Sequence, residues 1–315
     1  MSFDLLAALQ AQEPIYPIRF SADSYINVLV VGAGGTGARV ALDLARIAYD
    51  AKRSGIKVRV GLCDGDKVER KNVGRQLFVP ADIGRNKAEV IAEIANADYG
   101  IGMVAYPFWF DMTMFVIPNG KAKKVNNPTN RKSYTWEYSL QRNKHFGFAS
   151  GDINLIVGCV DETQTKKLPA RWHIAQVCHN YQNVWWLDCG NDLRDGQVSL
   201  GNSGTEASIN TMMGIATNVP SPAIQMPDII KPSAEPKPDE SCADLTARRE
   251  QGLMVNSMIA TVASQYLYKI VIERALDTFY TYADTGTMEM TSKRVTQSAI
   301  SEFGVPFKDT SPTIG

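Results

Sequence analysis

A group of polar side chains between positions 64 and 87 suits the handling of an anionic ligand. Arg75 carries a planar fork of donors that fits phosphate oxygens, and Lys87 is a compact positive charge at the start of a predicted helix. Asp64 ends a predicted strand, where an acidic residue can hold ribose hydroxyls. The group comprises Asp64, Asp66, Asn72, Arg75, Gln76 and Lys87. Two cations and an amide in one short segment predict a triphosphate site.

A glycine turn precedes this group and must position it. Residues 26–37 read INVLVVGAGGTG, so a continuous apolar run ends in Gly32, Gly34, Gly35 and Gly37. Such a run predicts a buried parallel strand, and the helical spacing of apolar residues over 38–48 predicts a helix behind the turn. The N-terminus of such a helix favours phosphate. The pattern alone fits NAD, FAD or another nucleotide, and close helix–strand packing is a structural alternative for the glycines.

Strands and helices then alternate along the chain, which predicts a doubly wound, Rossmann-like α/β fold with a mainly parallel sheet and extra C-terminal antiparallel strands. We expect strands at 57–64, 101–110, 154–160, 184–191, 196–201 and 287–300. We expect helices at 87–97, 170–181 and 243–276, and disorder over 307–315. The whole chain, 1–315, is predicted to be one domain.

The composition excludes several classes of protein. With 44% hydrophobic residues and a formal net charge of zero over 315 residues, the chain has no overall field that favours nucleic acid or membrane. No apolar run approaches the ~20 residues that span a bilayer. The N-terminus shows no signal-peptide pattern. Five scattered cysteines indicate a reducing compartment, and we expect a cytoplasmic protein.

The order and spacing of several motifs resemble the family of ThiF, MoeB and the ubiquitin-activating enzymes. The family pattern is GxGGxG, then D-x-D, N-x-x-R-Q and D-I-G-x-x-K-A. This chain has GAGGTG at 32–37, DGD at 64–66, NVGRQ at 72–76 and DIGRNKA at 82–88. A later LIVGCVDETQTKK matches the family's apolar strand followed by an aspartate, here Asp161. Within the family the chain looks closest to the ThiF-like protein of the PRTRC system.

The resemblance implies ATP-dependent adenylation of the C-terminal carboxylate of a small ubiquitin-like protein, with thioester transfer as a following step, in a homodimer. Gly32, Gly34, Gly35 and Gly37 would shape the phosphate turn, and Asp64 would hold the ribose. Asn72, Arg75 and Lys87 would hold the phosphates, Asp66 and Gln76 would line the nucleotide site, and Asp161 would bind Mg²⁺. Arg75 and Lys87 would also stabilise the departing pyrophosphate.

These roles have structural alternatives. Asp66 could be a turn residue after Gly65, and Asn72 and Asp161 could cap helices. Arg75 and Lys87 could be surface charges. Many family members bind structural zinc through two CxxC pairs, but this chain has no CxxC, so we expect no zinc.

Two further segments have an unusual composition, and the first of them fits the family pattern poorly. Residues of about 111–150 are basic and aromatic, which predicts an insertion that contacts a partner, with single-stranded nucleic acid as a weaker alternative. The proline-rich stretch of about 219–242 predicts a crossover loop that can be neither helix nor central strand. It ends at Cys242, before the predicted helix, where a thiolate would have a lowered pKa. Cys242 is therefore a candidate thioester cysteine, although an incidental cysteine is equally compatible.

Two other functions compete with adenylation. An NAD-dependent oxidoreductase would use the glycine turn and Asp64 but would leave Arg75, Lys87 and Asp161 without a role. A catalytically silent scaffold would bind a nucleotide or a partner without turnover.

Overall fold

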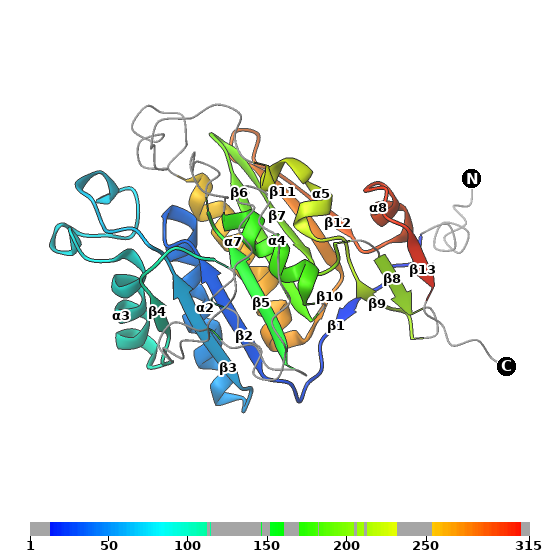
Figure 1. Cartoon of the computed structure of the whole chain (residues 1–315), viewed down its shortest axis with the longest axis horizontal. Helices are drawn as coiled ribbons and strands as arrows, with labels where there is room; N and C mark the ends of the chain where they lie inside the picture. Colours follow the sequence, from blue (N-terminus) through cyan, green and yellow to red (C-terminus); the bar gives the residue numbers. More distant parts are fainter. Residues whose placement is uncertain are drawn as a thin grey trace, which may run out of the picture.

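A computed structural model describes most of the chain, as two sheets with helices packed around them (Figure 1). The described residues are 13–111, 114, 146, 152–160, 170–181, 183–204, 207–210, 213–231 and 254–309. The predicted Asp161, Cys242, most of the 111–150 insertion, the end of the proline-rich stretch and residues 243–253 lie outside them.

The larger sheet has eight strands and carries the glycine turn near its centre. Its order is β12-β11-β7-β6-β5-β2-β3-β4. In chain order the strands are β2 (Ile26–Val31), β3 (Val58–Cys63), β4 (Val104–Tyr106), β5 (Ile153–Gly158), β6 (Val184–Asn191), β7 (Asp195–Gly201), β11 (Thr278–Asp284) and β12 (Glu289–Arg294). Neighbours from β4 to β6 pair in parallel, and neighbours from β6 to β12 pair antiparallel. The predicted fold class is confirmed.

Helices cover both faces of the parallel part of this sheet. One layer holds α2 (Gly35–Arg53), α3 (Lys87–Tyr99) and α7 (Val255–Tyr268), whose buried residues share one core with Val28 and Val30 of β2. The other layer holds α4 (Ala170–Asn180), α5 (Pro222–Gln225) and the 3-10 turn η4 (Pro227–Ile230). There Leu29 and Val31 of β2 share a second core with Ile174. Because β2 is buried on both faces, its residues are apolar except for Asn27, and they do not alternate between apolar and polar.

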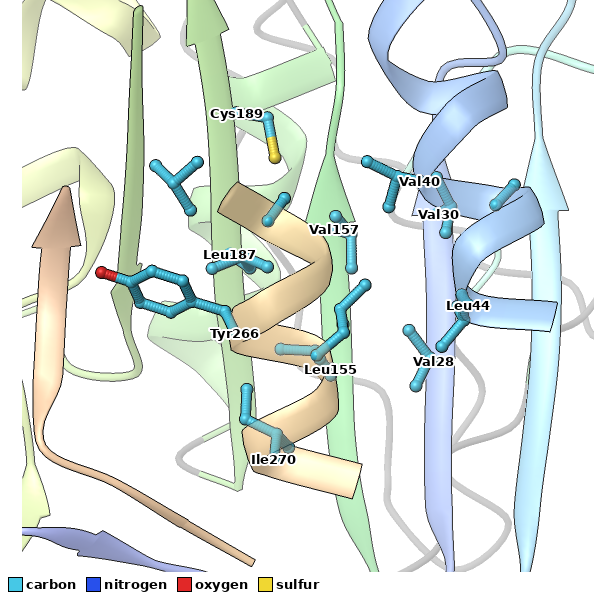
Figure 2. Close-up of a cluster of buried hydrophobic side chains, with 14 of the residues drawn as sticks. Val28, Val30, Val40, Leu44, Leu155, Val157, Leu187, Cys189, Tyr266 and Ile270 are labelled. Carbon is cyan, nitrogen blue, oxygen red and sulfur yellow. The ribbon is translucent and has the colours of Figure 1, made fainter. Parts of the chain in front are cut away.

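Figure 2 shows the first of these cores between the strands and the helices. Val28, Leu155 and Leu187 come from three neighbouring strands, and Leu44 and Tyr266 come from α2 and α7. All five side chains are buried. Burial of each large apolar side chain stabilises the fold by about 1.5–3 kcal/mol. This core holds α2 and α7 side by side. The start of α7 therefore lies next to the glycine turn.

A smaller sheet contains the first and last strands of the described residues, with the five strands in the order β10-β1-β9-β8-β13 (Figure 1). Its strands are β1 (Ile18–Arg19), β8 (Ala207–Asn210), β9 (Ile215–Asn218), β10 (Ala275–Leu276) and β13 (Phe307–Asp309). Ile18 pairs with both Leu276 and Ala216. These strands are too short to produce a period in the sequence, so sequence reasoning missed this sheet.

Several predicted elements are wrong in their details. The predicted helix 243–276 ends early: after α7 comes the π-helical turn η5 (Lys269–Glu273), and Arg274 with a φ of 57° leads into β10. The predicted strand 287–300 is β12 followed by α8 (Gln297–Ser301), because the Thr296 side chain accepts a hydrogen bond from the Ala299 backbone and starts a helix. The predicted strand 101–110 is only β4.

Two predictions of irregular structure are also wrong. The stretch 219–242 contains α5 and η4, since proline near the first helical position of each needs no hydrogen-bonding N–H. The predicted disorder over 307–315 fails at 307–309, which form β13 because they pair with β8.

Candidate functional site

The glycine turn lies where three parallel strands end at the same level. Val31 at the end of β2 pairs with Cys63 of β3 and with Gly158 of β5. The next backbone groups continue this pairing, because the Gly32 N–H donates to the Cys63 carbonyl at 2.8 Å. The carboxyl end of a parallel sheet, where the chain turns into a helix, is where α/β proteins bind ligands.

Close backbone contacts require glycine at two positions of this turn, Gly32 and Gly37. Gly32 has a φ of +97°, and a Cβ there would lie 2.3 Å from the Cys159 carbonyl oxygen. A Cβ on Gly37 would lie 1.9 Å from the Gly32 carbonyl oxygen. A Cβ on Gly34, in contrast, would meet only the Gln76 amide nitrogen at 3.9 Å, an ordinary contact. The packing alternative therefore holds for Gly32 and Gly37, while Gly34 leaves an open surface at the start of α2.

Asp64 ties this turn to the end of β3. Its Oδ2 accepts a hydrogen bond from the Ala33 backbone at 2.6 Å, and its Oδ1 accepts one from the Asp66 backbone at 2.8 Å. Burial raises the pKa of Asp64, while the charge of Lys87 and these two backbone donors oppose the rise. Each carboxylate oxygen keeps a second lone pair for a ligand hydroxyl.

Asp66 and Lys87 form an ion pair at the edge of the same site. The Lys87 Nζ lies 3.0 Å from the Asp66 Oδ2, and the Lys87 backbone N–H donates to the Asp66 carbonyl at 3.0 Å. Lys87 is only 5% exposed, so the structural alternative in which Lys87 is a surface charge is wrong. Asn86, which sequence reasoning missed, caps α3 and donates to the Asp64 carbonyl at 2.8 Å. Its position directly before the helix was the available signal.

The 3-10 turn η1 (Arg70–Asn72) and the residues after it carry two buried atoms without a partner. The Asn72 Oδ1 accepts a hydrogen bond from the Glu69 backbone at 2.8 Å, which confirms the capping alternative and leaves Nδ2 pointing elsewhere. That Nδ2 and the Gln76 Oε1 are buried and have no hydrogen-bond partner among the residues that the structure describes. Arg75 is half-buried in the same turn, and its backbone N–H donates to the Asn72 carbonyl at 3.2 Å. Buried polar atoms without a protein partner are costly. Because the Gln76 amide lies 3.9 Å from where a Cβ on Gly34 would be, these atoms fit a polar ligand near the glycine turn.

Sequence reasoning also missed two contacts at this turn. Asn256, at the start of α7, accepts hydrogen bonds from Thr36 in the first turn of α2 and from Asn191 at the end of β6. The Trp109 ring lies against Gly65, where a Cβ would come within 2.6 Å of it, and this side chain is 47% exposed. Both contacts join residues far apart in the chain, which no local pattern reveals.

The predicted metal ligand and the predicted thioester cysteine are not placed by the structure. Asp161 and Cys242 lie outside the described residues. The segment before Asp161 does pass the turn, because a Cβ on Gly32 would lie 3.1 Å from the Val160 side chain. Within the described part of the chain, no three acidic, histidine or cysteine side chains gather into a metal-binding group. None of the described helices is long and apolar enough to cross a bilayer.

Comparison with known proteins identifies the family. The model of the ThiF family matches residues 23–301. Among solved structures, the chain is similar to PaaA, with 16% identity over 86% of this chain and 64% of PaaA and a TM-score of 0.49. It is also similar to Escherichia coli MccB with ATP, with 15% identity over 87% of this chain and 64% of MccB and a TM-score of 0.48. The chain thus spans less than two thirds of these proteins.

Proposed function

The chain belongs to the ThiF family, and on that premise we propose that it uses ATP to adenylate a substrate carboxylate. The observation that carries the proposal is the pair of buried atoms that have no partner among the described residues, Asn72 Nδ2 and Gln76 Oε1, in a segment whose Gln76 amide lies 3.9 Å from where a Cβ on Gly34 would be. Arg75 belongs to this segment, and Lys87 adds a second cation to the matched motifs. A donor and two cations match the three negatively charged phosphates of a nucleoside triphosphate. ATP supplies the α-phosphorus as electrophile and pyrophosphate as leaving group.

The protein's part in this reaction is positioning and charge neutralisation. The substrate carboxylate oxygen forms a bond to the α-phosphorus, the bond from that phosphorus to the bridging oxygen breaks, and pyrophosphate leaves with that electron pair. Asp64 would orient the ribose, and Asn72 and Gln76 would contact the nucleotide. Arg75 and Lys87 would neutralise the charge that grows on the departing pyrophosphate. Asp161 would bind a Mg²⁺ ion through its carboxylate, which suits this hard cation.

We propose that the carboxylate belongs to the C-terminus of a small ubiquitin-like protein. Strands β7, β11 and β12 leave part of one face open, where Gln197 and Tyr282 pair across the sheet and are half-buried. Tyr282 donates to Asp195 at 2.7 Å, which raises the pKa of Tyr282 to about 12. This polar and aromatic surface suits the docking of a protein. Thioester transfer to Cys242, a homodimer, a cytoplasmic location and the placement near the PRTRC proteins stay predictions.

The test is pyrophosphate exchange into ATP in the presence of a small protein that co-purifies with this chain. We expect exchange with wild type and a loss of at least about tenfold in Arg75→Ala and Asp161→Ala, because each removes a charged contact. Arg70→Ala, in the same connection but outside the matched motif, is the control. Exchange that persists unchanged in both motif variants contradicts the assigned site.

Calorimetric titration separates the rival functions. ATP binding with exchange supports adenylation, whereas ATP binding without exchange supports the silent scaffold. Tight binding of NADH with no binding of ATP supports the oxidoreductase. A Cys242→Ser variant that keeps exchange but loses a thiol-sensitive adduct with the partner supports thioester transfer, and the absence of any adduct in wild type rules it out.

A further inference from the structure

We propose that Asn256 is a further phosphate-binding residue, whose side-chain amide donates a hydrogen bond to the nucleotide at the start of α2. The inference rests on the proposed function, because it assumes a nucleotide at the glycine turn. Asn256 belongs to α7, far from the motifs that define the turn in the sequence.

The orientation of the Asn256 amide is set by two donors. Its Oδ1 accepts from the Thr36 hydroxyl at 3.0 Å and from the Asn191 amide at 2.5 Å. With both donors on the oxygen, the Nδ2 group must face the other way. It faces Gly35, where a Cβ would lie 2.5 Å from this nitrogen. The missing side chain at Gly35 therefore makes room for the Asn256 amide at the first residue of α2.

Both hydrogen bonds between the Asn256 side chain and the described residues end on Oδ1, and Asn256 is only 6% exposed. The Nδ2 group therefore still needs an acceptor. A ligand oxygen at the glycine turn would be that acceptor.

The start of α2 lacks the groups that normally satisfy a helix N-terminus. Its N-cap, Gly34, makes no side-chain capping hydrogen bond, and no acidic residue lies in the first turn. The backbone N–H groups of the first turn and the positive end of the helix dipole therefore favour an anion there. Asn256 adds a side-chain donor at Gly35 to these backbone donors. A phosphate oxygen at the start of α2 would accept hydrogen bonds from both kinds of donor.

Two substitutions at Asn256 separate phosphate binding from a purely structural role. Asn256→Asp keeps an oxygen that can accept from Thr36 and Asn191, but it replaces the amide donor with a negative charge. Asn256→Ala removes the hydrogen bonds and adds no charge. If the residue binds phosphate, the Asp variant binds ATP more weakly than the Ala variant. If it only joins α7 to α2, the Asp variant binds ATP better than the Ala variant.

The experiment is calorimetric titration of the full chain with ATP, with thermal unfolding without nucleotide measured in parallel. We expect ATP affinity to fall by about tenfold to hundredfold in Asn256→Asp and less in Asn256→Ala. Ser264→Ala is the matched control, because Ser264 joins the same two helices through Asp43 at 3.1 Å but lies away from the turn. This control should bind ATP as wild type does.

Other outcomes overturn the inference. An Asn256→Asp variant that binds ATP as well as the Ala variant, or as well as wild type, overturns it and leaves the proposed function standing. If wild type itself binds no ATP, the proposed function fails, and the role of Asn256 fails with it.

Discussion

Two ion pairs of nearly equal length lie against the larger sheet, and their surroundings differ. Lys87 and Asp66 are 3.0 Å apart, and the Asp66 side chain is 44% exposed. Arg171 and Asp188 are 2.9 Å apart, and the Asp188 side chain is fully buried. Both cations are almost completely buried. The two pairs therefore differ in the exposure of their carboxylates. Only Asp66 is accessible to water, so only Asp66 can release its cation to a ligand and remain solvated.

The Arg171–Asp188 pair joins α4 to β6 and has no open side. Arg171 also donates to the Cys189 carbonyl at 3.3 Å, and a Cβ on Gly158 would lie 2.9 Å from an Asp188 oxygen. Burial raises the pKa of Asp188, and the charge and hydrogen bond of Arg171 oppose the rise. Such a pair holds the fold in one arrangement, whereas the Lys87–Asp66 pair places a cation at the proposed nucleotide site.

The largest effect is expected from Arg171→Met. This change leaves the Asp188 carboxylate buried without its partner, which should lower the free energy of unfolding by about 3–5 kcal/mol. Urea unfolding measures the loss. Lys87→Met, which leaves a solvated Asp66, should lose only about 1 kcal/mol. Equal losses in the two variants would remove the distinction between the pairs.

The next effect concerns ligand affinity. Lys87→Met should weaken ATP binding by about tenfold to hundredfold, because a charged contact to phosphate is lost. Lys71→Met is the control: Lys71 pairs with Glu69 at 3.2 Å in the same connection, outside the matched motif. Calorimetric titration compares the two variants. A control that loses as much affinity as Lys87→Met would mean that the loss reflects net charge rather than the site.

The pH dependence of the Arg171→Met variant is a smaller and more specific effect. Removing Arg171 raises the pKa of Asp188 further above the ordinary aspartate value of about 3.9. The folded state then binds more protons than the unfolded state between these two pKa values, so stability falls as pH rises through that window. The slope should approach about 1.4 kcal/mol per pH unit. The measurement is the unfolding midpoint of the variant relative to wild type as pH rises above about 4. If this difference does not become more negative, Asp188 stays ionised without Arg171.

The smallest effect is expected from Asp66→Asn. Because Asp66 is close to half exposed, its pair with Lys87 should contribute no more than about 1 kcal/mol to stability. Asp188→Asn leaves the buried Arg171 without its charged partner, so it should lower the free energy of unfolding clearly more. Thermal unfolding of the two variants makes the comparison, and a larger loss in Asp66→Asn would reverse our assignment of the two pairs.

Much of the fold and part of the site could be predicted from local patterns. The apolar run before Gly32 predicted a strand buried on both faces, and β6 was predicted with its observed limits, 184–191. Lys87 and Asp66 were predicted as nucleotide contacts, and the structure brings them together with Asp64. Strands such as β1 and β10 could not be predicted, because two residues carry no period and their pairing depends on a partner elsewhere in the chain.

The sequence by itself determined the central parallel strands, the glycine turn and the charged residues that follow it, because apolar runs, glycines and motif spacing are local properties. Tertiary structure alone decided which other side chains reach that turn. Asn256 meets Thr36 across 220 positions of the chain, and Arg171 finds Asp188 only when α4 packs on β6. Hydrogen bonds and burial depend on distance in space, so contacts of this kind exist only after the helices have packed on the sheet.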